Sequence, residues 1–531
     1  MKFFNLIIKL LYSVYESLQS CFTIDLYFGI SPCSIKSKND HSAIILFPCH
    51  VNSFFCGLAG LVSFVRNKAS VSVINIPHFK EMAAAISEKS IEFCKEKNLS
   101  VEDYYLGGEN LIESLLMEVQ LLKQDHLFYK IFLDNGLQDD LTDLKQLLNK
   151  IIKHEAKALT DLMGLLSVKE LDAASKRLEG LRDAAWSLDR EVLCNIKKVE
   201  DLLQNNQTEP SLSTLVIFKK INVILNSIDY LEVRGRDSTG ISLLFILDKN
   251  EYELFLEAIQ KNSQPEALMD EFEQRSKYDI LVNRSIGISQ NGNNEKESTV
   301  AVTITYKIAA EIGSLGDNIN YIRSQVKEDS ILHLLSGFSC KNNTVSAHTR
   351  WASIGAISEY NCHPVDNKTI NDNNKGCGII HVCLNGDIDN YRTLKNEYEE
   401  SGCRIHKDIT TDTKIIPIQI EKYLNQGLNI SEAFRMAVND FDGSHAISMH
   451  TDLAPGKLFL AQKGSGQAVF VGLADNYYIS ASEVYGFVEE TNRYLKMDGE
   501  KVVDGKQGPV QGQIFVLNQD SSGGLDGIDA L

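Results

Sequence analysis

The sequence has little proline and tryptophan, and its cysteines show no metal-binding spacing. Nine prolines and two tryptophans among 531 residues indicate long helices and few rigid loops. The eleven cysteines form no C-x-x-C pair, so the usual zinc spacing is missing and we expect neither a metal site nor a cofactor. Unpaired thiols scattered through a large chain favour a reducing compartment, here the cytoplasm.

Positive charge is also scarce. The 53 Lys and Arg residues against 71 Asp and Glu residues give a formal net charge of −18, and no basic run offsets it. Such a surface repels phosphate backbones, which argues against nucleic-acid binding as the main activity. The apolar stretch at 2–15 is interrupted by Lys9 and is too short to span a bilayer, so we expect no membrane partner.

Composition and length predict several globular domains. Apolar residues make up 44% and charged residues 23%, and 531 residues correspond to three or four domains. Short apolar runs with β-branched residues predict strands at 43–47, 56–65 and 70–76.

A regular helical pattern occupies much of the segment from about 80 to 205. Two rows of mostly apolar residues repeat every seven positions, which is typical of a coiled-coil seam. The rows are Leu171, Leu178, Ala185, Val192, Val199 and Ala174, Leu181, Leu188, Asn195, Leu202. Ser167 and Glu170 form a plausible capping box at the start, and a leucine-rich helix at 141–162 precedes it. This predicts a helical hairpin, either a protruding structural insert or a partner-binding arm.

The second half of the chain alternates strands and helices. We expect a helix at 214–233 and strands at 241–247 and 299–309. Strands and short turns dominate from 344 onward, with helices at 411–424 and 431–440.

Six short motifs, in this order, carry the functional signal. They are CGLAG at 56–60, RGRDSTG at 234–240, HTRWASIG at 348–355, NCHP at 361–364, LNGDIDNY at 384–391 and TTDT at 410–413. Together they resemble the class II glutamine amidotransferases, which are N-terminal-nucleophile hydrolases, and most closely the glutaminase half of glutamine–fructose-6-phosphate aminotransferase. The tail at 463–500 agrees.

The resemblance implies that Cys56 is the nucleophile. Hydrolysis of a side-chain amide needs a good nucleophile, and a thiolate is one at modest pKa. In this family the cysteine is the mature N-terminus, and its own α-amine, with a pKa of roughly 7.7–8, acts as the base. The alternative for Cys56 is a packed strand thiol among Phe54, Phe55 and Leu58.

Asn385 and Gly386 map onto the family's oxyanion hole. There an Asn side chain and the following backbone N–H stabilise the tetrahedral intermediate by a few kcal/mol each. The alternative is an ordinary Asn-Gly hairpin turn. Leu384 stands where the family has a histidine, which affects fine tuning rather than the oxyanion hole itself.

Other family positions predict how glutamine is held. Arg350 would clamp the α-carboxylate and Asp412 would receive the α-ammonium; the alternative for both is a surface charge. Trp351 corresponds to the lid residue, and Ser353 stands where the family usually has threonine. Arg234 corresponds to a residue that supports the nucleophile's terminus, with a purely structural role as the alternative.

The position of Cys56 predicts processing. It lies 55 residues into the chain and follows Phe55, so removal of the initiator methionine cannot expose it. We therefore expect residues 1–55 to be a leader or propeptide. We expect an amidotransferase domain at 56–67 and 213–518, with a mainly helical insertion at 68–212 and a second insertion at 250–305. Residues 519–531 would be a linker or the start of a following domain.

The resemblance implies an α+β fold: a four-layer αββα N-terminal-nucleophile sandwich carrying a helical-hairpin insertion. It implies a glutaminase that releases ammonia from glutamine for the conversion of fructose 6-phosphate to glucosamine 6-phosphate. Fructose 6-phosphate becomes a partner only if sugar-isomerase domains follow or associate. The chain would act as a homodimer or with a partner synthase. The alternatives are an inactive amidotransferase-like interaction module and a glutaminase subunit for another ammonia acceptor.

Overall fold

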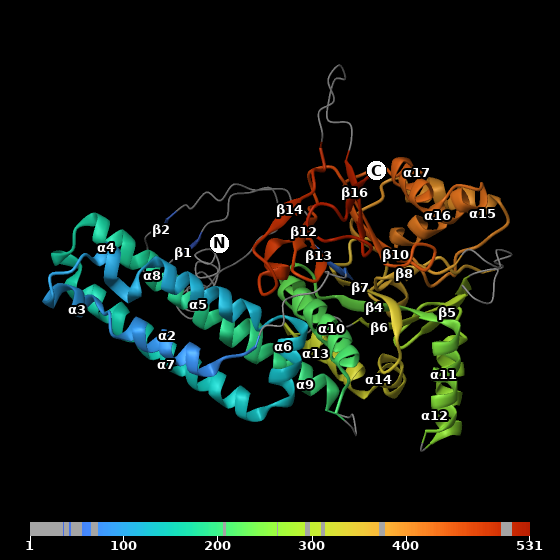
Figure 1. Ribbon diagram of the computed structural model, residues 1–531. Helices are drawn as coiled ribbons and strands as arrows, with labels where there is room; N and C mark the ends of the chain where they lie inside the picture. Colours follow the sequence, from blue (N-terminus) through green and yellow to red (C-terminus); the bar gives the residue numbers. More distant parts are fainter. Residues whose placement is uncertain are drawn as a thin grey trace. The chain divides into compact units, whose positions relative to one another are not determined.

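The computed structural model describes residues 56–64, 73–204, 209–262, 264–291, 298–309, 314–370, 378–500 and 512–531 (Figure 1). It also describes the backbone of a short antiparallel pair, β1 (Ile35–Lys36) and β2 (Ser42–Ala43). The predicted leader and the strand expected at 43–47 otherwise lie outside the described residues. Residues 54–531 form one compact unit, and residues 1–53 form another.

Two antiparallel sheets form the centre of the larger unit. The eight-stranded sheet has the order β14-β12-β13-β3-β7-β4-β6-β5. Its strands are β3 (Gly57–Ser63), β4 (Ser238–Asp248), β5 (Ile286–Asn291), β6 (Thr299–Ala309), β7 (Cys340–Arg350), β12 (Phe470–Leu473), β13 (Tyr477–Ala481) and β14 (Tyr494–Lys496). The six-stranded sheet has the order β16-β15-β11-β10-β9-β8. Its strands are β8 (Val365–Asp366), β9 (Ile380–Gly386), β10 (His445–Thr451), β11 (Lys457–Lys463), β15 (Gln513–Asn518) and β16 (Ile528–Ala530).

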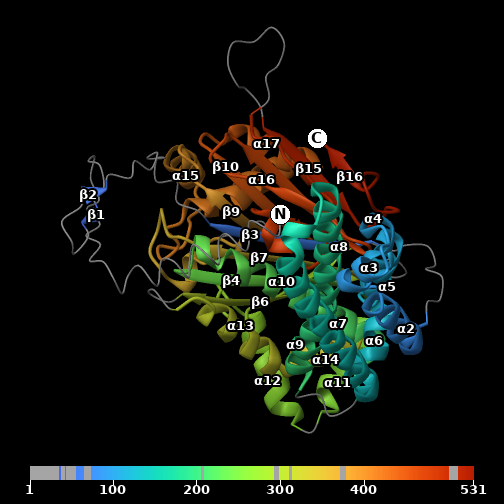
Figure 2. The same cartoon turned by 90° about the vertical axis from the view of Figure 1, so that its left-hand side faces the viewer.

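Each sheet packs against helices and against the other sheet. The helix α10 (Leu212–Leu231) packs on β3 and β7 (Figure 2), and its apolar side chains join those strands in one core cluster. The helices α15 (Tyr391–Glu400), α16 (Ile415–Asn425) and α17 (Ile430–Asp440) share a second cluster with β9, β10 and β11. A third cluster joins Val62 and Tyr478 of one sheet to Leu458 and Leu517 of the other. The fold is therefore α+β with two packed antiparallel sheets.

The segment from 76 to 203 is helical and contains the predicted hairpin. The helices are α2 (Ile76–Ser87), α3 (Ile91–Glu96), α4 (Val101–Tyr104), α5 (Glu109–Leu121), α6 (Asp125–Leu133), α7 (Asn135–Leu162), α8 (Val168–Trp186) and α9 (Cys194–Leu203). The two long helices α7 and α8 pack together, and Ser167 and Glu170 form the predicted capping box at the start of α8. The segment holds more than a hairpin, because α2–α6 also pack in it.

The heptad seam does not continue as one regular coiled coil. A π-helical turn at Ser187–Leu193 separates α8 from α9. A π-turn inserts extra backbone into the helix, so it rotates the faces of the following turns. As a result, α9 packs on α10, whereas α8 packs on α5 and α7. The seam residues are still mostly buried, although against different partners.

Two predicted segments differ from the structure. The strand expected at 70–76 is wrong over its described part, because residues 73–75 are irregular and α2 begins at Ile76 with Asn75 as its N-cap. The side chain of Asn75 accepts a hydrogen bond from the backbone of His78, which favours a helix start over a strand. In the segment 519–531, expected to be a linker or the start of a following domain, residues 528–530 form the edge strand β16.

The predicted second insertion contributes to the large sheet. It contains α11 (Lys249–Gln260), α12 (Pro265–Ser276), β5 and most of β6, and β6 pairs with β4 along its whole length. Two more helices follow, α13 (Asp317–Glu328) and α14 (Ser330–Ser336). None of the described helices is long and apolar enough to cross a membrane.

Candidate active site

Cys56 lies at the start of β3, beside the end of β7. The two strands pair with Gly57 opposite Thr349, which places Cys56 next to Arg350 and Trp351. Only glycine fits at position 57, because an added Cβ would lie 2.5 Å from Thr349 Cγ2 and 2.6 Å from Leu231 Cβ. The close approach of β3 to α10 and β7 therefore fixes the position of the neighbouring thiol, which is only 7% exposed.

The thiol of Cys56 contacts the backbone of Trp351. The Trp351 N–H donates to Sγ at 3.3 Å, and the thiol donates to the Trp351 carbonyl at 3.5 Å. Burial raises the pKa of Cys56 to about 11, although the Trp351 N–H and the charges of Arg350 and Arg234 act in the opposite direction. In this form of the chain the sulfur is a neutral thiol, and it needs a base to become a nucleophile.

Asn385 reaches Cys56 directly from the other sheet. Its Nδ2 donates to the Cys56 carbonyl oxygen at 3.1 Å. Its Oδ1 lies 2.9 Å from His348 Nε2, so the histidine fixes which end of the amide faces Cys56. Burial and the charge of Arg350 lower the pKa of His348 to about 3, which keeps the imidazole neutral.

Gly386 ends β9 in a conformation that favours glycine. Its φ is +85°, and an added Cβ would lie 2.2 Å from the Ser444 carbonyl. Asn385 and Gly386 pair with Ala446 and His445 of β10, so this Asn-Gly dipeptide is not the hairpin turn considered as the alternative. It is the end of a strand that places an amide donor beside Cys56.

Arg350 and Asp412 are buried charged groups of the same site. The Arg350 guanidinium donates to the carbonyls of Ile354 and Ala356, which fixes the loop after Trp351. The Asp412 carboxylate is 4% exposed and accepts from the Ile388 N–H at 2.8 Å. Burial and, to a lesser degree, the neighbouring Asp387 raise the pKa of Asp412 to about 6, although Arg350 lowers it. Neither group is the surface charge considered as the alternative.

Trp351 and Ser353 belong to the loop after β7. Trp351 is 45% exposed, and the hydroxyl of Ser353 donates to Asp387 Oδ1 at 2.6 Å. The Ala352 N–H donates to Asp237 Oδ2 at 2.8 Å, which ties this loop to the RGRDSTG segment. The loop thus lies between the Cys56 end of the large sheet and the segment after β9.

Arg234 supports Cys56 through the loop after β13. Its guanidinium pairs with Glu483 at 2.7 Å and donates to the Ser482 carbonyl at 3.3 Å. The Ser482 hydroxyl in turn accepts from the Leu58 N–H at 3.2 Å and lies 3.5 Å from the Cys56 carbonyl oxygen.

The structure thus brings all eight predicted residues to one region, by direct contact or through one intervening residue or charge. The motifs did not single out His348, Ser482 or Asp237. His348 and Asp237 lie inside quoted motifs, and Ser482 lies in the tail at 463–500, where nothing marked this residue individually. His363, in the NCHP motif, is buried, and its Nε2 lies 2.7 Å from the Thr413 hydroxyl. Among the described residues no group of three His, Cys, Asp or Glu side chains is placed to hold a metal ion.

Comparisons with known proteins support the resemblance. A family model described as a glutamine amidotransferase domain matches residues 370–489. The glutamine–fructose-6-phosphate aminotransferase (isomerizing) of Methanothermobacter thermautotrophicus is 34% identical over 158 residues, which is 30% of this chain and 25% of that protein. The enzyme of the same name from Geobacillus kaustophilus is 34% identical over 164 residues, with the same coverage. The chain therefore spans about a quarter of the length of these relatives.

Among solved structures, an allosteric regulatory enzyme of purine biosynthesis aligns with a TM-score of 0.33 at 15% identity, over 58% of this chain and 45% of that one. That likeness is too weak to carry an argument, so the sequence matches decide. They show that residues 370–489 match a glutamine amidotransferase domain and that part of the chain is similar to part of the glutamine–fructose-6-phosphate aminotransferases.

Proposed function

We propose that the chain hydrolyses the side-chain amide of glutamine at Cys56 and releases glutamate and ammonia. The observation that carries this proposal is the hydrogen bond from Asn385 Nδ2 to the Cys56 carbonyl, next to the Trp351 N–H at the sulfur. It joins the side-chain amide of Asn385 to the backbone of Cys56, more than 300 residues away in the sequence. Asn385, Gly386 and Asp412 also fall inside the matched amidotransferase domain.

The reaction begins with a proton transfer at a liberated terminus. Removal of residues 1–55 converts the Cys56 amide nitrogen into an amine, whose pKa of roughly 7.7–8 suits a base near neutral pH. This amine takes the thiol proton, and the thiolate attacks the amide carbon of glutamine. The resulting oxyanion accepts hydrogen bonds from Asn385 Nδ2 and the Gly386 N–H. The ammonium returns its proton to the leaving nitrogen, so ammonia departs and a glutamyl thioester remains. Water, deprotonated by the same amine, then releases glutamate.

Arg350 and Asp412 are the proposed binding groups for the α-carboxylate and the α-ammonium of glutamine. A guanidinium has five N–H donors, so Arg350 retains donors for the α-carboxylate beyond those it gives to the loop carbonyls. The Asp412 carboxylate would receive the α-ammonium. Trp351 and Ser353 would close over the substrate, and Arg234 would hold the Cys56 terminus through Ser482.

The layers of the fold support the same assignment. We propose a four-layer αββα sandwich, with α10 outside the large sheet, α15–α17 outside the smaller sheet, and an apolar cluster between the sheets. In this scheme the amidotransferase domain comprises 56–67 and 213–518, and 68–212 and 250–305 are elaborations of it.

We further propose fructose 6-phosphate as the ammonia acceptor, which would yield glucosamine 6-phosphate. The support is the name shared by the curated relatives. The sugar-isomerase step would be supplied by further domains or by a partner chain, in a homodimer or a complex with a synthase. The free cysteines found along the described part of the chain support a reducing, cytoplasmic location.

The deciding experiment combines an intact-mass measurement with a glutaminase assay on the same purified sample. We expect a species that begins at Cys56, and glutamate release in proportion to its amount. A stable chain with an intact peptide bond before Cys56 that still hydrolyses glutamine would overturn the terminal-amine mechanism. The same chain without activity would show that processing is required.

Replacing the oxyanion donor tests the stabilisation of the intermediate. We expect Asn385→Ala to lower kcat for glutamine hydrolysis by about 10²–10³-fold with a smaller change in KM, because the lost hydrogen bond strengthens only as the oxyanion forms. Asn367→Ala is a matched control, since this buried amide bonds Glu421 at 3.1 Å in the same unit. An unchanged kcat in Asn385→Ala contradicts the assignment.

The pKa of Asp412 predicts a pH dependence of glutamine binding. Because the carboxyl has a pKa of about 6, it is charged above pH 6 and becomes neutral as the pH falls. The Kd of glutamine, measured calorimetrically on the processed Cys56→Ala variant, should therefore rise about tenfold per pH unit below pH 6. In Cys56→Ala/Asp412→Asn, binding should be weak and independent of pH from 5 to 7. A constant Kd in the single variant over that range rules out this role of Asp412.

A further inference from the structure

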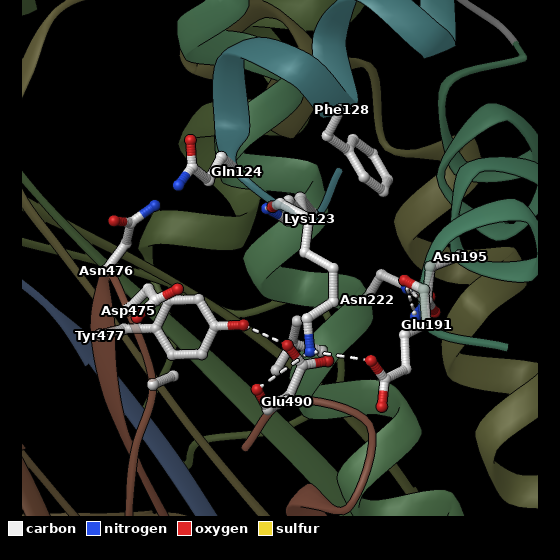
Figure 3. Close-up of a pocket in the computed structure, with 13 residues that line it drawn as sticks. Lys123, Gln124, Phe128, Glu191, Asn195, Asn222, Asp475, Asn476, Tyr477 and Glu490 are labelled. Atoms are coloured by element: carbon white, nitrogen blue, oxygen red, sulfur yellow. Dashed lines mark hydrogen bonds and ion pairs between the residues drawn. The ribbon is translucent and has the colours of Figure 1, made fainter. Parts of the chain in front are cut away.

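Two neighbouring cavities lie where the helical segment meets α10 and the start of β13, and the larger of them extends to the far ends of β3 and β7. The smaller, about 40 Å³ in volume, is lined by Lys123, Glu191, Tyr477 and Glu490 among others (Figure 3). Its charges are matched: Lys123 Nζ lies 3.0 Å from Glu191 and donates to two backbone carbonyls, and the Tyr477 hydroxyl donates to Glu490. This cavity has room for only one or two waters and is a closed structural network.

The larger cavity differs from the smaller one in its volume and in having polar side chains without partners among the described residues. Its volume is about 460 Å³, which lies in the range of small-molecule sites. Ser63 at the end of β3, Asn343 near the start of β7 and Lys220 of α10 contribute to its lining. It shares none of its lining with the candidate active site. Ser63 and Cys56 are at opposite ends of β3, which corresponds to about 20 Å.

One cation in the wall of this cavity has no partner among the residues that the structure describes. Lys219 pairs with Asp125 at 2.6 Å, and Lys341 pairs with Asp248 at 2.6 Å. Lys220 makes no hydrogen bond or ion pair with any residue that the structure describes. The side chain of Lys220 is partly buried, and burial lowers its pKa, although Cys340 and Asp125 act in the opposite direction. An anion placed in the cavity would relieve that cost.

Four side chains of the same lining carry buried polar atoms without a partner in the described part of the chain. These atoms are Ser63 Oγ, Gln124 Oε1, His126 Nε2 and Asn343 Oδ1. The four atoms are themselves buried, so each side chain would have to rotate before it could bond a ligand in the cavity. A simple anion only accepts hydrogen bonds and leaves the two amide oxygens unmatched. A hydroxyl both donates and accepts, so it satisfies oxygen and nitrogen atoms alike.

We propose that this cavity binds a small hydroxylated anion, either a sugar phosphate or a sugar acid. Its anionic group pairs with Lys220, and its hydroxyls bond the side chains of Gln124, His126 and Asn343. The site is separate from Cys56, and the proposal does not depend on glutamine hydrolysis.

Cys340 provides a readout that is independent of activity. This thiol lines the same cavity and is partly exposed, so a bound ligand shields it from alkylation. The full chain is treated with iodoacetamide in the presence of glucose 6-phosphate, gluconate, glucose or inorganic phosphate, and modification of Cys340 is followed by mass spectrometry together with Tm. We expect glucose 6-phosphate or gluconate to slow alkylation and raise Tm, and the responding probe identifies the anionic group. Glucose should have no effect, and inorganic phosphate a weaker one.

Variants at Lys220 decide whether the cavity is responsible. Lys220→Gln should weaken binding of the responding probe at least tenfold, because an ion-paired hydrogen bond is lost. It removes an unpaired buried charge and should therefore fold. Lys150→Gln, at an exposed position on α7, is the charge-matched control and should bind as the parent does. The proposal is overturned if no charged probe protects Cys340 better than glucose. It is also overturned if phosphate alone equals the best probe, or if Lys220→Gln retains full affinity.

Discussion

Substitution of Cys56 by alanine should abolish glutamine hydrolysis. The thiolate forms the covalent bond to the substrate, so its loss removes the reaction path rather than one stabilising contact. We expect the rate of glutamate release to fall by at least about 10⁴-fold, the scale on which loss of a nucleophile acts in covalent catalysis. The change should be confined to kcat, because Arg350 and Asp412 still hold glutamine.

A buried cysteine elsewhere separates this effect from a loss of stability. Cys94 of α3 is fully buried and lies in the helical segment, far along the chain from Cys56. Cys94→Ala should cost about 1 kcal/mol in the free energy of unfolding and leave the glutaminase rate unchanged. A glutamine analogue with a diazoketone in place of the amide adds a second readout: it should alkylate Cys56, with loss of nitrogen, in the parent but not in Cys56→Ala. Turnover retained by purified Cys56→Ala would refute the mechanism.

The motifs were enough to identify the site residues, because each of these residues lies at an end of a strand or just before a helix. Cys56 directly precedes β3, Arg350 ends β7, Asn385 and Gly386 are the last residues of β9, and Asp412 precedes α16. Chain ends of antiparallel strands are where a sheet can present side chains to a ligand, and the residue types were readable from the sequence. The partners that orient them were not. His348 meets Asn385 only because two strands of different sheets face each other, and Ser482 meets Cys56 through a loop more than 400 residues away.

The larger cavity also could not be predicted from the sequence. Its lining comes from six separate parts of the chain, at Ser63, His126, Lys220, Asn343, Asn476 and Gln519. The sequence offered one local sign, the adjacent lysines 219 and 220 inside the otherwise apolar stretch TLVIFKKINVIL. Whether such a lysine finds a carboxylate depends on packing across α6 and α10, so only the structure distinguishes the paired Lys219 from Lys220.

We expect mild acid to destabilise the protein strongly, because several histidines are buried between the two sheets. His381 Nδ1 lies 2.8 Å from the Ser242 hydroxyl, and His450 Nδ1 lies 2.8 Å from the Ser346 hydroxyl. Burial lowers the pKa of His381 to about 3 and holds that of His450 well below its usual range. His348 and His445 have pKa values of about 3 and about 4 for the same reason.

The lowered pKa values of these histidines decide whether stability rises or falls with pH. Between about pH 6.5 and pH 4 the unfolded chain binds protons at these histidines and the folded chain does not, so stability falls as the pH falls. Each histidine contributes about 1.4 kcal/mol per pH unit, and two of them over two units remove about 5 kcal/mol, comparable with the whole stability of a domain. Four carboxyls with raised pKa values act in the opposite direction as the pH falls, namely Asp412, Asp229, Glu232 and Glu490. The histidines with lowered pKa values outnumber them, and the unfolded chain begins to protonate its histidines at a higher pH than its carboxyls.

Urea unfolding followed by circular dichroism at pH 7.5, 6.5 and 5.5 measures this loss, and we expect the unfolding free energy to drop by several kcal/mol over the series. His381→Gln keeps a hydrogen-bonding side chain but removes a titrating group, so its stability should depend less steeply on pH than that of the parent. His78→Gln, at an exposed position on α2, should leave the slope unchanged. Equal stability at pH 7.5 and 5.5 would mean that the histidines between the sheets accept protons without unfolding, and the neutral polar layer inferred from their burial would be wrong.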